Sequence, residues 1–147
     1  MSIALALHVL SAVIWVGGMF FAYVCLRPVA ASLLEPPARL KLWSGVFERF
    51  FRWVWVSVVV LIGTGHTMIG LFGGMGAVGK HVHLMMLLGY LMFALYAGLF
   101  FIPFRHLREA VQAEEWPSAG AQLNRIRKIV ATNLFLGLVV VIIASFW

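Results

Sequence analysis

The sequence predicts an all-α membrane protein, built as a bundle of four transmembrane helices with both termini on the non-cytoplasmic side. The first observation is composition: 63% of the 147 residues are hydrophobic, 11% are charged, and the mean hydropathy is +1.01. A water-soluble domain has roughly 25% charged residues. This chain therefore has too few polar side chains to cover a surface in water, whereas a bilayer removes that requirement.

The second observation is a set of four apolar runs, at about residues 3–26, 50–72, 80–104 and 128–147. Each is close to the ~20 residues that a helix needs to cross the hydrocarbon core. The runs are continuously apolar and do not alternate, so helices are favoured over barrel strands. The first run lacks a basic start and is too long for a signal-peptide core, so we expect a retained helix. We expect one domain over residues 1–147.

The third observation is the distribution of the eleven basic residues. Counted together with the span ends next to them, the first and third connections each hold five, and the second holds only Lys80. The positive-inside rule then places the first and third connections in the cytoplasm and both termini in the periplasm of a bacterial inner membrane. The net charge of +6 thus reflects topology, and we expect no nucleic-acid partner. The ten basic residues of the first and third connections are Arg27, Arg39, Lys41, Arg49, Arg52, Arg105, Arg108, Arg125, Arg127 and Lys128.

The first connection is expected to hold an amphipathic helical segment that begins near residues 36–37 and lies at the membrane interface. Leu40, Trp43, Phe47 and Phe50 follow one another at steps of three and four residues. Together with Phe51, Trp53 and Trp55, these aromatic residues are interpreted as an interfacial belt.

The third connection is expected to break at residues 116–118, with Ser118 capping the helix that follows. Residues 73–76, rich in glycine, are expected to form the outer turn between the second and third spans. In the fourth span, Thr132 and Asn133 are interpreted as hydrogen-bonding partners between helices.

Histidines near the outer membrane surface give the main functional signal. Ionisable residues inside a membrane are costly and are functional candidates. At 1.5 Å per residue, His8 lies roughly 7 Å and His66 roughly 9 Å below the outer end of its span. His81 and His83 open the third span from the same side, whereas His106 is expected to be solvated in the cytoplasmic connection.

Helical spacing suggests which of these side chains face the bundle. His8 and Trp15 are seven residues apart and share a face, beside which Gly18 permits close approach of a helix or a flat cofactor. On the third span His83 shares a face with Tyr90, while His81 points away from it. We therefore expect His83 to face inward.

These features indicate a haem b site in the outer half of the bundle. Imidazole ligates haem iron, and b-type haems sit in helical bundles between facing histidines. We expect His8 and His83 as the ligands, His66 and His81 as further candidates, and Lys80 near the haem propionates. The alternative is a copper site built from the same histidines and from methionines such as Met19, Met68, Met75, Met85 and Met86. A structural subunit, with histidines that only pack, is the third possibility.

Several motifs carry a resemblance to a known family. Residues 8–21 (HVLSAVIWVGGMFF), the pair Arg27-Pro28, and residues 34–40 (LEPPARL), 50–55 (FFRWVW) and 79–85 (GKHVHLM) resemble CopD-like membrane proteins of the copper resistance protein D superfamily. The resemblance covers nearly the whole chain and implies a small integral membrane protein. The family name implies copper handling.

The chain also resembles, more distantly, the HemJ-type protoporphyrinogen oxidases. It shares with them the His8-to-Trp15 spacing, Gly18 and a histidine at the start of the third span. This resemblance implies haem b ligation by His8 and by His81 or His83. It departs at His83, where the oxidase pattern has a lysine, so the substrate does not carry over. The expected role is membrane electron transfer or oxidation of a small or lipid-soluble substrate, with an unspecified electron donor and acceptor. Small-residue faces permit a homo-oligomer.

Overall fold

The computed structural model describes residues 1–146, and all regular secondary structure in them is helical. Four stretches are long and apolar enough to cross a membrane. The all-α, four-helix membrane class is therefore confirmed, and the bilayer is the environment of the chain. The elements are α1 (Ser2–Phe20), the π-helix η1 (Phe21–Leu26), α2 (Arg27–Leu33), α3 (Pro36–Leu71), α4 (Lys80–Phe101), α5 (Pro103–Gln112) and α6 (Trp116–Ser145).

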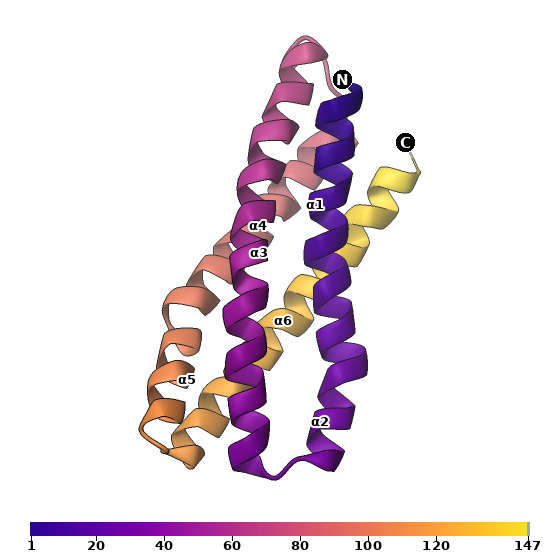
Figure 1. Ribbon diagram of the computed structural model, residues 1–147. Coiled ribbons are helices and arrows are strands. Elements are labelled where there is room, and N and C mark those ends of the chain that lie inside the picture. Colours follow the sequence, from indigo (N-terminus) through magenta and orange to yellow (C-terminus); the bar gives the residue numbers. More distant parts are fainter. Residues whose placement is uncertain (147) are drawn as a thin grey trace.

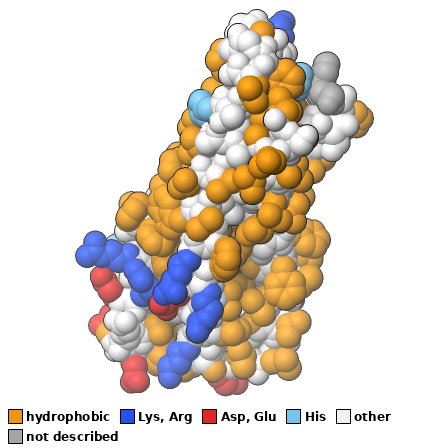
Figure 2. Space-filling model, turned by 45° about the horizontal axis from the view of Figure 1, so that its top comes forward, with side chains coloured by type: hydrophobic (Ala, Val, Ile, Leu, Met, Phe, Trp, Pro, Cys, Tyr) orange, Lys and Arg blue, Asp and Glu red, His pale blue; other side chains and the backbone are white. Residues whose placement is uncertain are grey.

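The two ends of the bundle differ in chemistry. Both termini and the α3–α4 turn lie at one end, and the α2–α3 and α5–α6 connections lie at the other (Figure 1). We call the first the histidine end, because His8, His66, His81 and His83 lie toward it. We call the second the arginine end, where Lys and Arg side chains gather beside Glu, while apolar side chains cover the body between them (Figure 2). The orientation in the membrane remains a prediction of the positive-inside rule.

Proline and glycine account for the irregular points of the helices. Pro28 lacks an N–H, and its ring would crowd the carbonyl one turn earlier, so the helix widens into the π-helix η1, which ends two residues before Pro28. Pro103 separates α4 from α5 in the same way, with Ile102 outside helical geometry. Gly73 and Gly74 have φ values of +102° and +92°, which favour glycine, and they form the expected outer turn.

The amphipathic segment of the first connection is not a separate interfacial helix. It forms the first part of α3, which runs unbroken for 36 residues because no proline or turn sequence interrupts it. The belt interpretation is wrong for Trp43, Phe47 and Phe51, whose exposed fractions are 5%, 4% and 2%. These rings face the other helices, whereas Trp53, 61% exposed, faces outward as a belt residue would.

A cluster of aromatic rings joins α3 to α4 and α5. Phe51 stacks on Phe47 with centroids 5.0 Å apart and meets Phe104 edge-on at 4.9 Å. The Tyr96 hydroxyl donates a 2.9 Å hydrogen bond to the Phe51 carbonyl. Such pairs each contribute about 0.5–1.5 kcal/mol beyond area burial. In a bilayer, where apolar burial gives helices little reason to associate, this packing holds the bundle together.

Three predictions about α6 have different outcomes. Asn133 is confirmed as an interhelical partner, because its amide nitrogen donates to the Met92 carbonyl at 3.1 Å. Thr132 instead bonds within its own helix, to the Lys128 carbonyl. The Ser118 cap is wrong: α6 begins at Trp116, so Ser118 is already inside the first turn.

Candidate functional site

A cavity of about 370 Å³ opens at the histidine end between α1, α3, α4 and α6. Its walls are mainly apolar, and small residues on several helices leave the space. The size is within the range of ligand pockets in proteins, about 300–1,000 Å³. Residues that line it include Leu5, His8, Val9, Ala12, Trp15, Val16, Leu61, Ile62, Gly65, His66, Met68, Val82, Met85, Met86, Gly89, Tyr90, Met92, Phe93, Gly137 and Val140.

His8 is fixed across the α1–α3 interface by Thr64. The His8 Nδ1 and the Thr64 hydroxyl oxygen are 2.8 Å apart. The same hydroxyl lies 2.6 Å from the Val60 carbonyl, which can only accept, so the Thr64 proton is donated there. The Thr64 oxygen must then accept from His8 Nδ1–H. A neutral His8 consequently carries its lone pair on Nε2, the nitrogen left for a ligand.

His66 adopts the same tautomer for an independent reason. Its Nδ1 lies 2.8 Å from the Ile62 carbonyl, one turn earlier in α3, and must donate to it. The Nε2 of His66 is therefore the lone-pair nitrogen, and it accepts a 3.2 Å hydrogen bond from the Tyr90 hydroxyl of α4. Two imidazoles on different helices thus line one cavity, each with Nε2 able to accept a ligand.

Four methionines stand in the same walls: Met68 from α3, and Met85, Met86 and Met92 from α4. Within residues 1–146, no group of three or more His, Cys, Asp or Glu side chains is arranged to hold a metal ion. The further soft donors around the two histidines are therefore thioethers.

His83 and His81 occupy different surroundings. Neither is among the residues that line the cavity. His83 is exposed, and its Nδ1 lies 3.1 Å from the Gly79 carbonyl at the start of α4. The His81 ring lies so close to Gly79 that a methyl group there would come within 2.7 Å of it. The structure therefore brings His8 together with His66, and not with His83, at the cavity.

Of the other predicted site residues, some line the cavity and some do not. Trp15 and Tyr90 line the cavity. Gly18 does not: it faces the Phe50 ring of α3, which would collide with any added methyl group. Lys80, the first residue of α4, is exposed and also lies outside the lining.

Thr64 is a candidate site residue that sequence reasoning missed. Its only signal was a hydroxyl inside an apolar span, two residues before His66 and flanked by Gly63 and Gly65. Gly65 matters for the contact, because a methyl group there would lie 3.4 Å from His8 Cε1. The pairing of His8 with Thr64 depends on how α1 and α3 are shifted and rotated against each other, which no pattern within one helix reveals.

The comparison with protein families identifies the group to which the chain belongs. Residues 44–147 match the family model described as CopD, copper resistance protein D. The match includes His66, His81 and His83 and leaves α1, with His8, outside. No curated protein and no solved structure matches the chain. Similarity to the HemJ-type oxidases stays a prediction. Because the match spans well over half of the sequence and includes two whole spans and most of a third, the chain belongs to the copper resistance protein D family.

Proposed function

We propose that this protein handles copper at the membrane, and that the histidine-end cavity binds Cu(I) through His8 and His66. One observation carries the proposal: a single apolar cavity holds two imidazoles of matching tautomer beside four methionines. Imidazole suits copper, and thioether selects its cuprous state. The proposal takes His66, in place of His83, as the partner of His8.

The character of the walls supports Cu(I) over a harder cation. No carboxylate is among the residues that line the cavity, and the walls are mostly hydrocarbon. Hard cations such as Mg²⁺ and Ca²⁺ prefer oxygen ligands. A monovalent ion with neutral nitrogen and sulfur donors brings the least charge into such surroundings, and burial of charge is costly in an apolar medium.

Packed aromatic rings support binding rather than open conduction. Trp15 lines the cavity and meets Tyr96 edge-on, with centroids 6.1 Å apart. Trp55 packs on Tyr96 at 5.1 Å, and Phe51 packs on it at 5.5 Å. These rings fill the bundle on the arginine side of the cavity. Copper therefore enters and leaves from the histidine end, which the positive-inside rule places in the periplasm.

The test is an anaerobic Cu(I) titration of the purified protein against a chromophoric cuprous chelator. We expect one Cu(I) per chain, and a loss of about tenfold or more in affinity for His8→Ala and for His66→Ala, since each removes a ligand. His106→Ala is the matched control at the arginine end, and His83→Ala distinguishes the two candidate partners. Unchanged affinity in His8→Ala and His66→Ala would refute this ligand set.

Haem b is a second candidate for the same cavity. The observation in its favour is that two Nε2 lone pairs come from separate helices, with Gly65 and Gly89 widening the space between the walls. Haem would supply one-electron chemistry for electron transfer or substrate oxidation. An absorption spectrum separates the candidates: a Soret band with reduced-minus-oxidised α-bands would favour haem, and a colourless protein with stoichiometric copper would favour Cu(I).

A further inference from the structure

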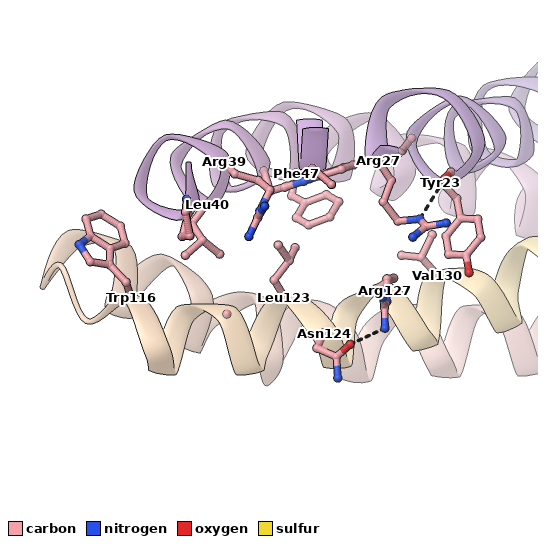
Figure 3. A pocket seen from close by; sticks show the side chains of 15 residues that line it. Tyr23, Arg27, Arg39, Leu40, Phe47, Trp116, Leu123, Asn124, Arg127 and Val130 are labelled. Atoms are coloured by element: carbon pink, nitrogen blue, oxygen red, sulfur yellow. Dashed lines mark hydrogen bonds between the residues drawn. The ribbon is translucent and has the colours of Figure 1, made fainter. Parts of the chain in front are cut away.

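A second cavity, of about 380 Å³, lies at the arginine end between η1, α2 and the start of α3 on one side and α6 on the other (Figure 3). Arg27, Arg39 and Arg127 line it. We propose that this cavity binds the phosphate group of an anionic amphiphile, with a membrane phospholipid as the source. The copper proposal does not involve this site, so the two inferences stand or fall separately.

The charges around the cavity are unbalanced. No Glu is among the residues that line it, and the sequence has five acidic residues in all. The ion pairs of the described residues lie elsewhere, between Arg52 and Glu48 and between Arg105 and Glu109. Three guanidinium groups around one space repel one another unless an anion lies between them. The planar, forked donors of arginine match the oxygens of phosphate and carboxylate groups, which they can bind through two parallel hydrogen bonds.

The arginines retain hydrogen-bonding capacity. Arg27 Nε donates to the Tyr23 carbonyl at 3.2 Å, and its guanidinium lies 4.5 Å from the Tyr23 ring centroid. Arg127 donates to the Asn124 side-chain oxygen at 2.6 Å. The side chain of Arg39 makes no hydrogen bond or ion pair within residues 1–146, while its backbone N–H donates to the Glu35 carbonyl at 2.9 Å. Each guanidinium group has five N–H donors. The groups of Arg27 and Arg127 each use one donor in the bond that holds them in place, so most of their donors stay available for a ligand.

Apolar walls indicate that the ligand also carries hydrocarbon. Leu40 and Phe47 of α3 face Leu123 and Val130 of α6 across the space, with Arg39 extending between the two walls in Figure 3, and Trp43 also lines the cavity. A soluble phosphate would leave these surfaces uncovered. A phospholipid covers them with its glycerol and upper acyl carbons while its phosphate meets the arginines.

The depth of the cavity fits a headgroup. At 1.5 Å per residue, Arg27 lies roughly 38 Å along the helix from Ser2, and Arg127 lies roughly 27 Å from Ser145. The hydrocarbon core is about 30 Å thick, so both guanidinium groups lie near its boundary at the arginine end. Basic pockets between transmembrane helices on the cytoplasmic side bind anionic headgroups.

The experiment measures lipid binding to the full-length protein by native mass spectrometry and by thermal unfolding. The added probes are phosphatidylglycerol, phosphatidylcholine, and inorganic phosphate. Arg39→Gln and Arg127→Gln remove donors from the cavity. Arg52→Gln and Arg105→Gln are controls with the same change in charge, since these side chains are 74% and 69% exposed and paired with Glu one turn away.

We expect phosphatidylglycerol to bind and to raise the unfolding temperature, while phosphatidylcholine does neither. Each cavity variant should weaken the binding of phosphatidylglycerol about tenfold, the value of one charge-assisted hydrogen bond, and the control variants should leave it within about twofold. Equal, arginine-dependent binding of inorganic phosphate would keep the anion site and assign it to a soluble phosphate. Equal loss in cavity and control variants, or no loss in either, would overturn the proposal. Gel filtration of every variant verifies that it is folded.

Discussion

Thr64→Val tests how the structure prepares His8 for a metal. Valine has nearly the shape of threonine and lacks the hydroxyl, so α3 keeps its packing while His8 loses its acceptor. In the native arrangement Thr64 accepts from His8 Nδ1 at 2.8 Å and donates to the Val60 carbonyl at 2.6 Å. Without that acceptor the ring is free to rotate, and the tautomer that leaves Nε2 unprotonated loses its preference. In the proposed Cu(I) site, Thr64 is thus a positioning residue that acts through His8.

The expected loss of Cu(I) affinity follows from the role of hydrogen-bond partners that hold a metal-binding histidine in place. Removing the outer partner of a metal-binding histidine lowers metal affinity by about 10- to 100-fold. That corresponds to about 1.4–2.8 kcal/mol. The cavity opens at the histidine end, so water can replace part of the lost bond, and we expect the lower part of this range.

The assay is the anaerobic Cu(I) competition titration, with thermal unfolding measured in parallel. Thr64→Ser, which keeps the hydroxyl, should restore most of the affinity. Thr67→Val is the matched control: Thr67 donates to the Gly63 carbonyl at 2.8 Å in the same helix and does not line the cavity. Wild-type Cu(I) affinity in Thr64→Val, or an equal loss in Thr67→Val, would show that the Thr64 hydroxyl does not position the ligand.

The remaining predictions concern the cavity, the core and the orientation. Tyr90→Phe should not lower Cu(I) affinity in the same titration, because the phenol donates to the lone pair that a metal would take; a tenfold loss would instead make Tyr90 part of the site. Tyr96→Phe should lower the free energy of unfolding in detergent by about 1 kcal/mol through loss of a buried hydrogen bond, and no change would contradict this. Gly137→Leu should cost about 1–3 kcal/mol in the same assay, since even a methyl group there would come within 2.9 Å of α1; Gly63→Ala, with open space around it, is the control. In a Cys25→Ser background, Met75→Cys should react with an impermeant maleimide added to intact cells and Ala113→Cys should not, and the reverse pattern would invert the topology.

Much of the fold could be predicted from the sequence because its causes act along the chain. A run of about twenty apolar residues is stable in lipid only as a helix, whatever its neighbours are. Glycines marked the turn at residues 73–76, and prolines marked the start of α3 at Pro36; the break before Pro103 was not predicted, and the expected break at residues 116–118 lies inside α6. The predicted division of α3 into an interfacial segment and a separate span is wrong. An amphipathic, aromatic sequence fits both an interfacial segment and a helix that packs against other helices. Phe104 and Tyr96, which lie in other helices, pack against Phe51 and so bury this part of α3 within the bundle.

The site shows the same division between local and tertiary causes. The sequence by itself determined that four histidines lie toward one end of the bundle, near one membrane surface, since depth along a helix follows from counting residues. Only the tertiary structure decided that His66 shares the cavity with His8 and that His83 does not, and it supplied Thr64 as the acceptor. The physical reason is that the rotation of each helix about its axis is set by side-chain packing between helices. In a bundle surrounded by lipid, with apolar residues on every face, the sequence of one helix carries little information about that rotation.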